Sequence, residues 1–186
     1  MSGWPLVVFS DSPAATKDVA GRLAALCGSG DVVLLMGDLG AGKTAFAQGF
    51  AAALGVEGPV TSPTFALVRQ YRCATSAPVT TLIHADVYRT GGLGEVVELA
   101  LAELVEERAI ALVEWGELAA PALGDDALEV LLELPGAGRD GTGSDRTGSD
   151  SELGERTIRI TGRGRWSVRA EEVERALTLR SPEAAQ

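Results

Sequence analysis

The sequence predicts an α/β protein with a single-domain P-loop NTPase-like fold. Residues 32–36 form an apolar run of strand length, followed by a glycine-rich turn and then by a helical pattern. A second apolar run, residues 109–114, ends in a carboxylate. Strand and helix patterns alternate along the chain, which is typical of a sheet covered by helices.

Length and charge limit the domain organisation and the partners. The 186 residues suit one domain spanning residues 1–186, because most domains hold about 100–150 residues. The 16 basic and 26 acidic side chains give a net charge of −10, which argues against broad contact with a nucleic-acid backbone. No apolar run approaches the roughly 20 residues of a membrane span, and the first residues lack the basic start of a signal peptide. We therefore expect a cytoplasmic protein that contacts no membrane.

The first half of the chain contains alternating strand and helix patterns. Ser12 and Pro13 are an N-cap and a first-turn proline, and predict a helix that runs through Leu26. A second helix follows the glycine-rich turn and ends at Leu54, where Gly55 is the expected residue after the helix. The expected strands cover residues 6–9, 32–36, a segment reaching about residue 71, and its hairpin partner 80–86.

The second half predicts further strands around one polar insertion. Apolar residues recur at helical spacing over residues 96–105, and a last helix is expected over residues 170–179. Residues 136–155 are rich in Gly, Ser, Asp and Arg, so we expect a disordered insertion there, and a frayed tail after about residue 180. Cys27 and Cys73 lack metal or redox spacing and are interpreted as reduced thiols. The remaining strands are expected at residues 109–114, 128–134 and 157–160.

The glycine-rich turn has the spacing G-x-x-x-x-G-K-[ST] of a phosphate-binding loop. Its glycines can adopt positive φ and turn backbone N–H groups towards phosphate oxygens at the start of a helix. Lys43 would reach the β- and γ-phosphates of ATP, and the Thr44 hydroxyl would bind Mg²⁺. A chance glycine-rich turn is the alternative. The expected ATP-binding residues of this loop are Gly37, Asp38, Leu39, Gly40, Ala41, Gly42, Lys43, Thr44 and Ala45.

Two carboxylates follow expected strands and are candidate catalytic residues with Lys43. Glu114 ends its strand where P-loop folds present a carboxylate to Mg²⁺, although such residues are often solvated strand ends. Asp86 also ends a strand and could orient water or sense the γ-phosphate. His84 shares the face of Asp86, yet a lone histidine is more often structural. Residues 61–64 carry three hydroxyls around a proline, which suits either a switch loop or a simple turn.

Five segments in order resemble the TsaE family, which contains the bacterial P-loop ATPases needed to make threonylcarbamoyladenosine in tRNA. The resemblance covers roughly residues 12–134. It implies a small sheet with helices on both faces, and a magnesium site formed by Thr44 and Glu114. It also implies that Asp86 is required for activity. The segments are Gly-Asp-Leu-Gly-Ala-Gly-Lys-Thr at 37–44, Thr-Ser-Pro-Thr-Phe at 61–65, His-Ala-Asp-Val-Tyr-Arg at 84–89, Glu-Leu-Ala-Leu-Ala-Glu-Leu at 98–104 and Val-Glu-Trp-Gly-Glu at 113–117.

The chain departs from the family pattern at two places. Gly116 stands where the family usually has proline, so we expect a looser chain after Glu114. The insertion obscures which arginine matches the nucleotide-contacting arginine of the family, and Arg156 is our choice. The family binds the adenine side near the segment before the first helix, so Asp11 to Pro13 are expected to contact the base.

The resemblance implies an ATPase that works with TsaB and TsaD. In such systems, the resemblance implies, TsaD carries out the transfer to tRNA and the TsaE protein hydrolyses ATP to reset the complex. The acidic charge balance agrees with contact to tRNA only through the complex. Two other hypotheses about the function stay open. One is a small-molecule P-loop kinase, and the other is a nucleotide-gated binding module that performs no hydrolysis.

Overall fold

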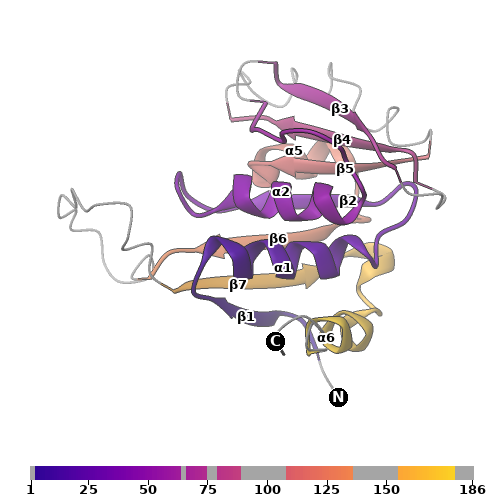
Figure 1. The fold of residues 1–186 in the computed structure, drawn as a ribbon. Coiled ribbons are helices and arrows are strands. Elements are labelled where there is room, and N and C mark those ends of the chain that lie inside the picture. Colours follow the sequence, from indigo (N-terminus) through magenta and orange to yellow (C-terminus); the bar gives the residue numbers. More distant parts are fainter. Residues whose placement is uncertain (1–2, 64–65, 75–78, 89–107, 136–154, 179–186) are drawn as a thin grey trace.

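The computed structural model describes residues 3–63, 66–74, 79–88, 108–135 and 155–178. These residues form one seven-stranded sheet in the order β1-β7-β6-β2-β5-β4-β3 (Figure 1). The strands are β1 (Leu6–Ser10), β2 (Val32–Met36), β3 (Val68–Arg72), β4 (Thr81–Asp86), β5 (Ala109–Glu114), β6 (Leu128–Glu133) and β7 (Arg156–Gly162).

Parallel strands form the centre of the sheet and antiparallel strands form its two edges. β6, β2, β5 and β4 run in one direction. β7 is antiparallel to β6, β1 to β7, and β3 to β4. Every residue of β5 is buried, because a central strand is covered on both faces. This burial explains why the sequence of β5 is almost continuously apolar.

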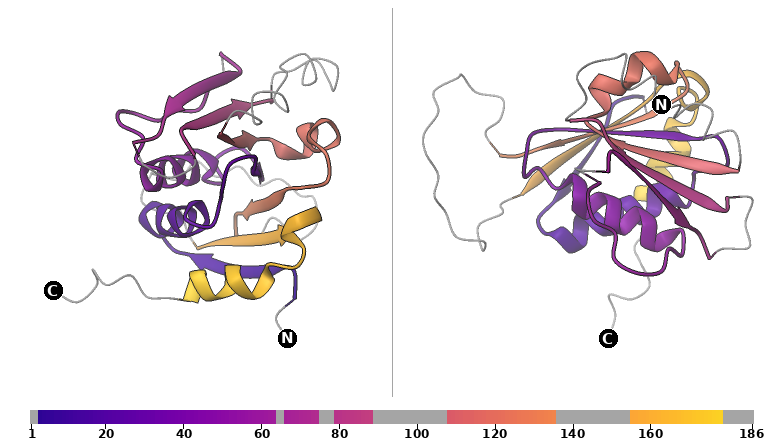
Figure 2. Two further views of the ribbon diagram at one scale, coloured as in Figure 1. Left: turned by 90° about the vertical axis from the view of Figure 1, so that its right-hand side faces the viewer. Right: turned by 90° about the horizontal axis from the view of Figure 1, so that it is seen from above.

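Helices cover both faces of the sheet, as predicted. The helices are α1 (Pro13–Ala24), α2 (Lys43–Ala53), α5 (Gly116–Leu123) and α6 (Ala170–Thr178), with a 3₁₀ turn η1 (Gly164–Trp166). α1 and α2 lie side by side on one face, and α5 lies on the other (Figure 2). α6 packs against α1 near the β1 edge. No helix in the described ranges is long and apolar enough to cross a membrane.

The predicted helix ends agree with the structure where a capping residue marks them. The Ser12 side chain accepts a hydrogen bond from the Ala15 N–H at 3.2 Å, and Pro13 opens α1. Gly55 follows α2 with φ 70°, the left-handed conformation that terminates helices. The end of α1 carries no such marker, and the helix stops at Ala24, two residues before the predicted Leu26.

The structure adds one helix for which the sequence analysis has no counterpart. α5 has eight residues, contains Pro121 and is apolar around most of its surface, so it shows no helical period. The expected helix at 96–105 and the tail after 180 lie outside the described residues. So do residues 64–65, Arg89, and all of the predicted insertion at 136–155 except Glu155.

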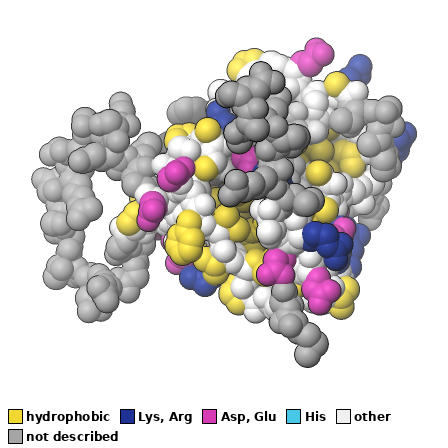
Figure 3. Space-filling view, turned by 60° about the horizontal axis from the view of Figure 1, so that its bottom comes forward, with side chains coloured by type: hydrophobic (Ala, Val, Ile, Leu, Met, Phe, Trp, Pro, Cys, Tyr) yellow, Lys and Arg dark blue, Asp and Glu magenta, His cyan; other side chains and the backbone are white. Residues whose placement is uncertain are grey.

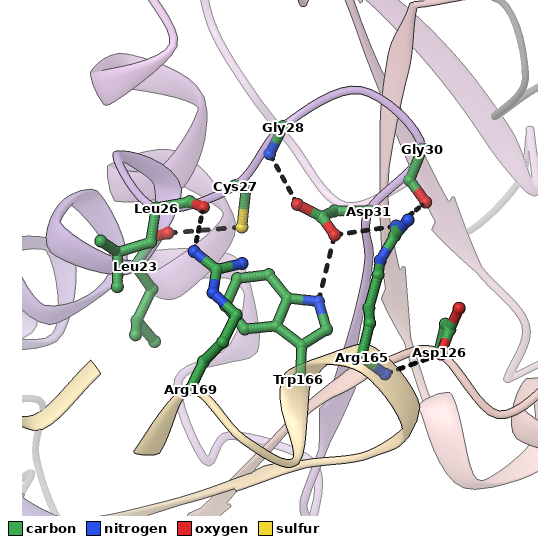
Figure 4. A network of polar contacts seen from close by, with 10 residues as sticks. All are labelled: Leu23, Leu26, Cys27, Gly28, Gly30, Asp31, Asp126, Arg165, Trp166 and Arg169. Carbon is green, nitrogen blue, oxygen red and sulfur yellow. Dashed lines mark hydrogen bonds and ion pairs between the residues drawn. The ribbon is translucent and has the colours of Figure 1, made fainter. Parts of the chain in front are cut away.

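A buried carboxylate attaches the C-terminal segment to the sheet (Figure 4). Asp31 precedes β2 and is 5% exposed. Its Oδ2 accepts from the Gly28 N–H at 2.6 Å, and its Oδ1 accepts from Trp166 Nε1 at 3.1 Å and Arg165 Nη2 at 2.9 Å. The Arg169 guanidinium lies 3.9 Å from the centre of the fully buried Trp166 ring. Asp31 therefore joins the loop before β2 to η1.

Replacement of Asp31 by Asn is expected to lower the free energy of unfolding by about 1–3 kcal/mol. The neutral amide loses the ion pair with Arg165, and its NH₂ group would face N–H groups that now donate to the carboxylate. Urea unfolding measures this change. Asp125→Asn is the control, since the Asp125 side chain is 92% exposed and pairs with Arg163 at 3.4 Å, and its effect is expected within about 0.5 kcal/mol. Equal effects of the two substitutions would contradict the anchoring role of Asp31.

Candidate functional site

Strand direction brings distant parts of the sequence to one edge of the sheet. The carboxyl ends of β2, β4 and β5 lie together because these strands are parallel, and Asp86 is paired with Glu114 in register. β7 runs the opposite way, so its first residue, Arg156, lies at the same edge. β1 ends there as well, with Ser10 opposite Arg156, and leads directly into α1.

A cavity of about 510 Å³ occupies this edge. The start of α2 forms one side of it, and the ends of β4 and β5 form another. Its lining residues are Pro13, Leu39, Gly40, Gly42, Lys43, Thr44, Ala45, Ser62, Asp86, Tyr88, Glu114, Trp115 and Arg156.

The glycine-rich loop depends on glycine at two closely packed positions. Gly37 has φ 125°, and a Cβ there would collide with the carbonyl oxygen of Leu132. Gly42 caps α2 with φ 109°, and a Cβ there would lie 3.3 Å from Arg156 Nε. The loop thus keeps open the approach to the positive end of the α2 dipole.

Lys43 is held inside the loop by its backbone. Its Nζ donates to the carbonyl oxygens of Gly37 and Asp38, at 2.5 and 2.9 Å, and lies 4.0 Å from the centre of the Trp115 ring. Burial lowers the pKa of the Lys43 ammonium, while nearby carboxylates, chiefly Glu114, act in the opposite direction. The cation is thus partly desolvated and available to an anionic ligand.

Both strand-end carboxylates are buried and hydrogen-bonded. Glu114 is 3% exposed, and its Oε1 lies 2.9 Å from Nε2 of His84. Asp86 is 4% exposed, and its Oδ2 accepts from the Ser62 hydroxyl at 2.7 Å. Its Oδ1 accepts from the Tyr88 N–H at 3.1 Å. The two carboxylates are therefore oriented by contacts from neighbouring elements.

Arg156 is buried beside the glycine-rich loop with much of its hydrogen-bonding capacity unused. It is 3% exposed, and its Nε and Nη1 have no hydrogen-bond partner within the described part of the chain. A buried guanidinium without a partner is costly to the fold. Since it faces the cavity, the missing partner is expected to be an anion bound there.

The donor set suits a hard cation that keeps water ligands. The Thr44 hydroxyl and the Glu114 carboxylate both line the cavity. The described residues contain no cluster of three or more His, Cys, Asp and Glu side chains that could hold a metal. Two oxygen ligands completed by water and phosphate are what Mg²⁺ uses in nucleotide sites.

The structure brings most of the predicted site residues together. Four of them do not line the cavity. Ala41 is fully buried, Gly37 and Asp38 face Lys43 with their carbonyl groups, and Asp11 is exposed to solvent while its neighbour Pro13 lines the cavity.

Sequence reasoning missed the aromatic wall of the cavity. The rings of Tyr88 and Trp115 lie 4.4 Å apart between centres, and both line the cavity. Their position one or two residues after a strand-end carboxylate was a signal for this role, because short extensions of parallel strands lie at the same edge.

A profile of the family described as "Threonylcarbamoyl adenosine biosynthesis protein TsaE" matches residues 10–140. The chain belongs to the TsaE family. Curated relatives that are named tRNA threonylcarbamoyladenosine biosynthesis protein TsaE share 44% identity in Mycobacterium bovis, over 63% of this chain and 73% of the relative. Identity is 41% in Streptomyces coelicolor, over 63% and 78% of the two chains, and 39% in Bacillus subtilis, over 67% and 75%.

A solved structure supports the same assignment. The crystal structure of Bacillus subtilis YdiB is similar, with a TM-score of 0.64 and 31% identity over 96% of each chain. The fold is therefore a P-loop NTPase-like α/β fold, and the TsaE family takes part in tRNA threonylcarbamoyladenosine biosynthesis.

The expected looseness after Glu114 was wrong. Gly116 is buried and begins α5. A Cβ at Gly116 would lie 2.6 Å from Leu34 Cβ and 3.0 Å from Leu34 Cα. The missing side chain allows α5 to approach β2 closely instead of loosening the chain.

Replacement of Gly116 by Ala is therefore expected to lower the free energy of unfolding by about 1–3 kcal/mol through overpacking. Gly21→Ala is the matched control, because a Cβ there would meet Ala53 Cβ at an ordinary 3.5 Å in the middle of α1. That control is expected to be neutral, or stabilising by up to about 1 kcal/mol. Thermal and urea unfolding of both variants measure the contrast, and a neutral Gly116→Ala would show that α5 can move away from β2.

Proposed function

We propose that this chain binds ATP with Mg²⁺ in the cavity and hydrolyses it, as the ATPase subunit of the tRNA threonylcarbamoyladenosine machinery. The observation that carries this proposal is the buried Arg156, whose Nε and Nη1 have no partner in the described residues and lie beside the glycine-rich loop. Arg156, Lys43 and the first turn of α2 all supply positive charge to this one cavity.

The residues of the cavity divide into a phosphate side and a carboxylate side. On the phosphate side, the loop backbone, Lys43 and Arg156 would hold the phosphate groups. On the other side, Thr44 and Glu114 would hold Mg²⁺, which neutralises charge that develops on the phosphate oxygens. Pro13, at the start of α1, would lie near the adenine end.

Asp86 would connect hydrolysis to the loop that contains Ser62. Both oxygens of its carboxylate already accept hydrogen bonds, one from the Ser62 hydroxyl and one from the Tyr88 N–H. A change at the γ-phosphate that moves Asp86 would therefore also move Ser62, which lines the same cavity. This linkage favours a role in conformational sensing as well as in orienting water.

Protein partners would complete the site. Leu39 and Tyr88 line the cavity but are 84% and 54% exposed, so the rim of the cavity is apolar. On the face shown in Figure 3, basic side chains lie among acidic ones, and this mixture does not suit a nucleic-acid backbone. We therefore propose that TsaB and TsaD are the partners and that tRNA is reached through them. The isolated chain would then be a slow ATPase.

Replacement of Arg156 by Met is expected to weaken ATP binding by about 10–100-fold, because a charge-assisted contact is lost. The same variant is expected to unfold at an equal or higher temperature without nucleotide, since it removes a buried guanidinium whose Nε and Nη1 find no hydrogen-bond partner in the described residues. Calorimetric titration and thermal unfolding measure the two effects. Arg159→Met is the control on the same strand, where an exposed guanidinium pairs with Glu133 at 3.3 Å, and ATP affinity should not change. A destabilised Arg156→Met with normal ATP affinity would argue for a structural arginine.

ATP hydrolysis by the chain alone, and with purified TsaB and TsaD, tests the proposed function directly. We expect stimulation of at least about tenfold that requires both partners, because partners order the site. Glu114→Ala should abolish the stimulated rate through loss of the magnesium ligand. ATP binding without stimulated hydrolysis would favour a nucleotide-gated module, and phosphate transfer to a metabolite would favour a kinase.

A further inference from the structure

We propose that His84 and Tyr71 form a buried hydrogen-bond relay that positions the Glu114 carboxylate. Neither His84 nor Tyr71 lines the cavity, and His84 is connected to it through Glu114. This inference rests on the proposed function only where it treats Glu114 as a ligand of Mg²⁺. The relay itself is a property of the protein without ligand.

The first contact of the relay joins neighbouring strands in the middle of the sheet. His84 on β4 is fully buried, and its Nε2 lies 2.9 Å from Oε1 of Glu114 on β5. His84 pairs in register with Leu112, so Glu114 is its diagonal neighbour on the same face. A rigid strand therefore holds the imidazole against one oxygen of the carboxylate and leaves the other oxygen free of it.

The contact determines which nitrogen of His84 carries the proton. A carboxylate only accepts hydrogen bonds, so Nε2 must donate, and in neutral imidazole Nδ1 is then an acceptor. Nδ1 is buried and has no hydrogen-bond partner within the described ranges. Nδ1, on the side of the ring away from Glu114, therefore still needs a hydrogen-bond donor.

Tyr71 carries a hydroxyl group that can donate a hydrogen bond. Its hydroxyl is also buried and unpartnered among the described residues, and its ring centre lies 6.4 Å from that of His84. Tyr71 pairs in register with Leu82, two residues before His84 on β4, which places both side chains on one face. The two groups, each without a partner among the described residues, thus belong to rings on one face of the sheet, and an ordered water bridging them would satisfy both at little cost.

The consequence for Glu114 is a fixed orientation. A histidine that donates to a ligating carboxylate sets which oxygen faces the metal, and loss of such an outer contact typically weakens metal binding by about 10–100-fold. His84 and Tyr71 are therefore positioning residues, since they act through Glu114 and do not touch the ligand.

The first test reads the tautomer of His84 and needs no ATP or metal. The chain has one histidine, so tag-free protein labelled with ¹⁵N gives a single imidazole pattern in long-range ¹H–¹⁵N spectra. We expect a proton on Nε2, because Glu114 accepts a hydrogen bond from that nitrogen. An Nε2 nitrogen that carries no proton would overturn the relay.

The second test measures how strongly Mg²⁺ promotes ATP binding. In His84→Leu we expect the Mg²⁺ concentration that gives half of the effect to rise by about 10–100-fold, while ATP affinity without Mg²⁺ is unchanged. His84→Gln retains an amide donor near the Nε2 position and is expected to restore the midpoint to within about threefold. A folded His84→Leu with the Mg²⁺ midpoint of the unaltered protein would refute the positioning role.

The third test addresses the far end of the relay. Tyr71→Phe removes only the hydroxyl and is expected to shift the Mg²⁺ midpoint in the same direction by about two- to fivefold. Gln70→Ala is the control, since Gln70 is an exposed neighbour on β3. An effect in the control that equals the effect of Tyr71→Phe would exclude a specific role for the hydroxyl.

The outcomes separate this inference from the proposed function. If the unaltered chain binds no ATP, the proposed function fails, while the tautomer still tests the His84 contact. If the unaltered chain binds ATP with Mg²⁺ and the His84 and Tyr71 variants match it, the relay fails and the proposed function stands.

Discussion

The shared direction of β6, β2, β5 and β4 is the constraint on which the cavity depends. Carboxyl ends of parallel strands meet at one edge of a sheet, so the glycine-rich loop, Asp86 and Glu114 converge although they lie far apart in the sequence. The antiparallel β7 contributes the complementary element. It begins at this edge with Arg156, which adds a cation where parallel strands present loops and carboxylates.

Several of the buried charged groups of the described residues gather near this cavity. Lys43, Asp86, Glu114 and Arg156 line it, and His84 lies directly behind it. Burial of such groups costs stability unless each finds a partner, and the partners of Arg156 Nε and Nη1 are missing within the described chain. A site that is incompletely satisfied without ligand and completed by phosphate groups would couple ligand binding to stability. The proposed ATPase function gives this arrangement a physical reason.

Two other features hold β2, the strand that leads into the glycine-rich loop. At the opposite end of β2, Asp31 joins the loop before the strand to η1 and so restrains the C-terminal segment. At the cavity end, Gly116 allows α5 to pack against Leu34. β2 is thus held at both ends, and the loop that follows it starts from a well-supported position. Glycine at position 116 thus permits a close contact between α5 and β2.

Local sequence determined the elements that have a strong signal of their own. The spacing of residues 37–44, the N-cap at Ser12, Gly55 after α2 and the apolar run at 109–114 predicted α1, α2, β2 and β5 closely, because capping and burial act over a few residues. The predicted lining residues Lys43, Thr44, Asp86, Glu114 and Arg156 meet in one cavity. Helix α5 escaped prediction because it is short and apolar without a clear period. The tertiary structure alone decided the contacts between strands, such as His84 with Glu114, Ser62 with Asp86 and Arg156 with the glycine-rich loop. Those contacts depend on the order and direction of strands in the sheet, and long-range pairing leaves no local pattern in the sequence.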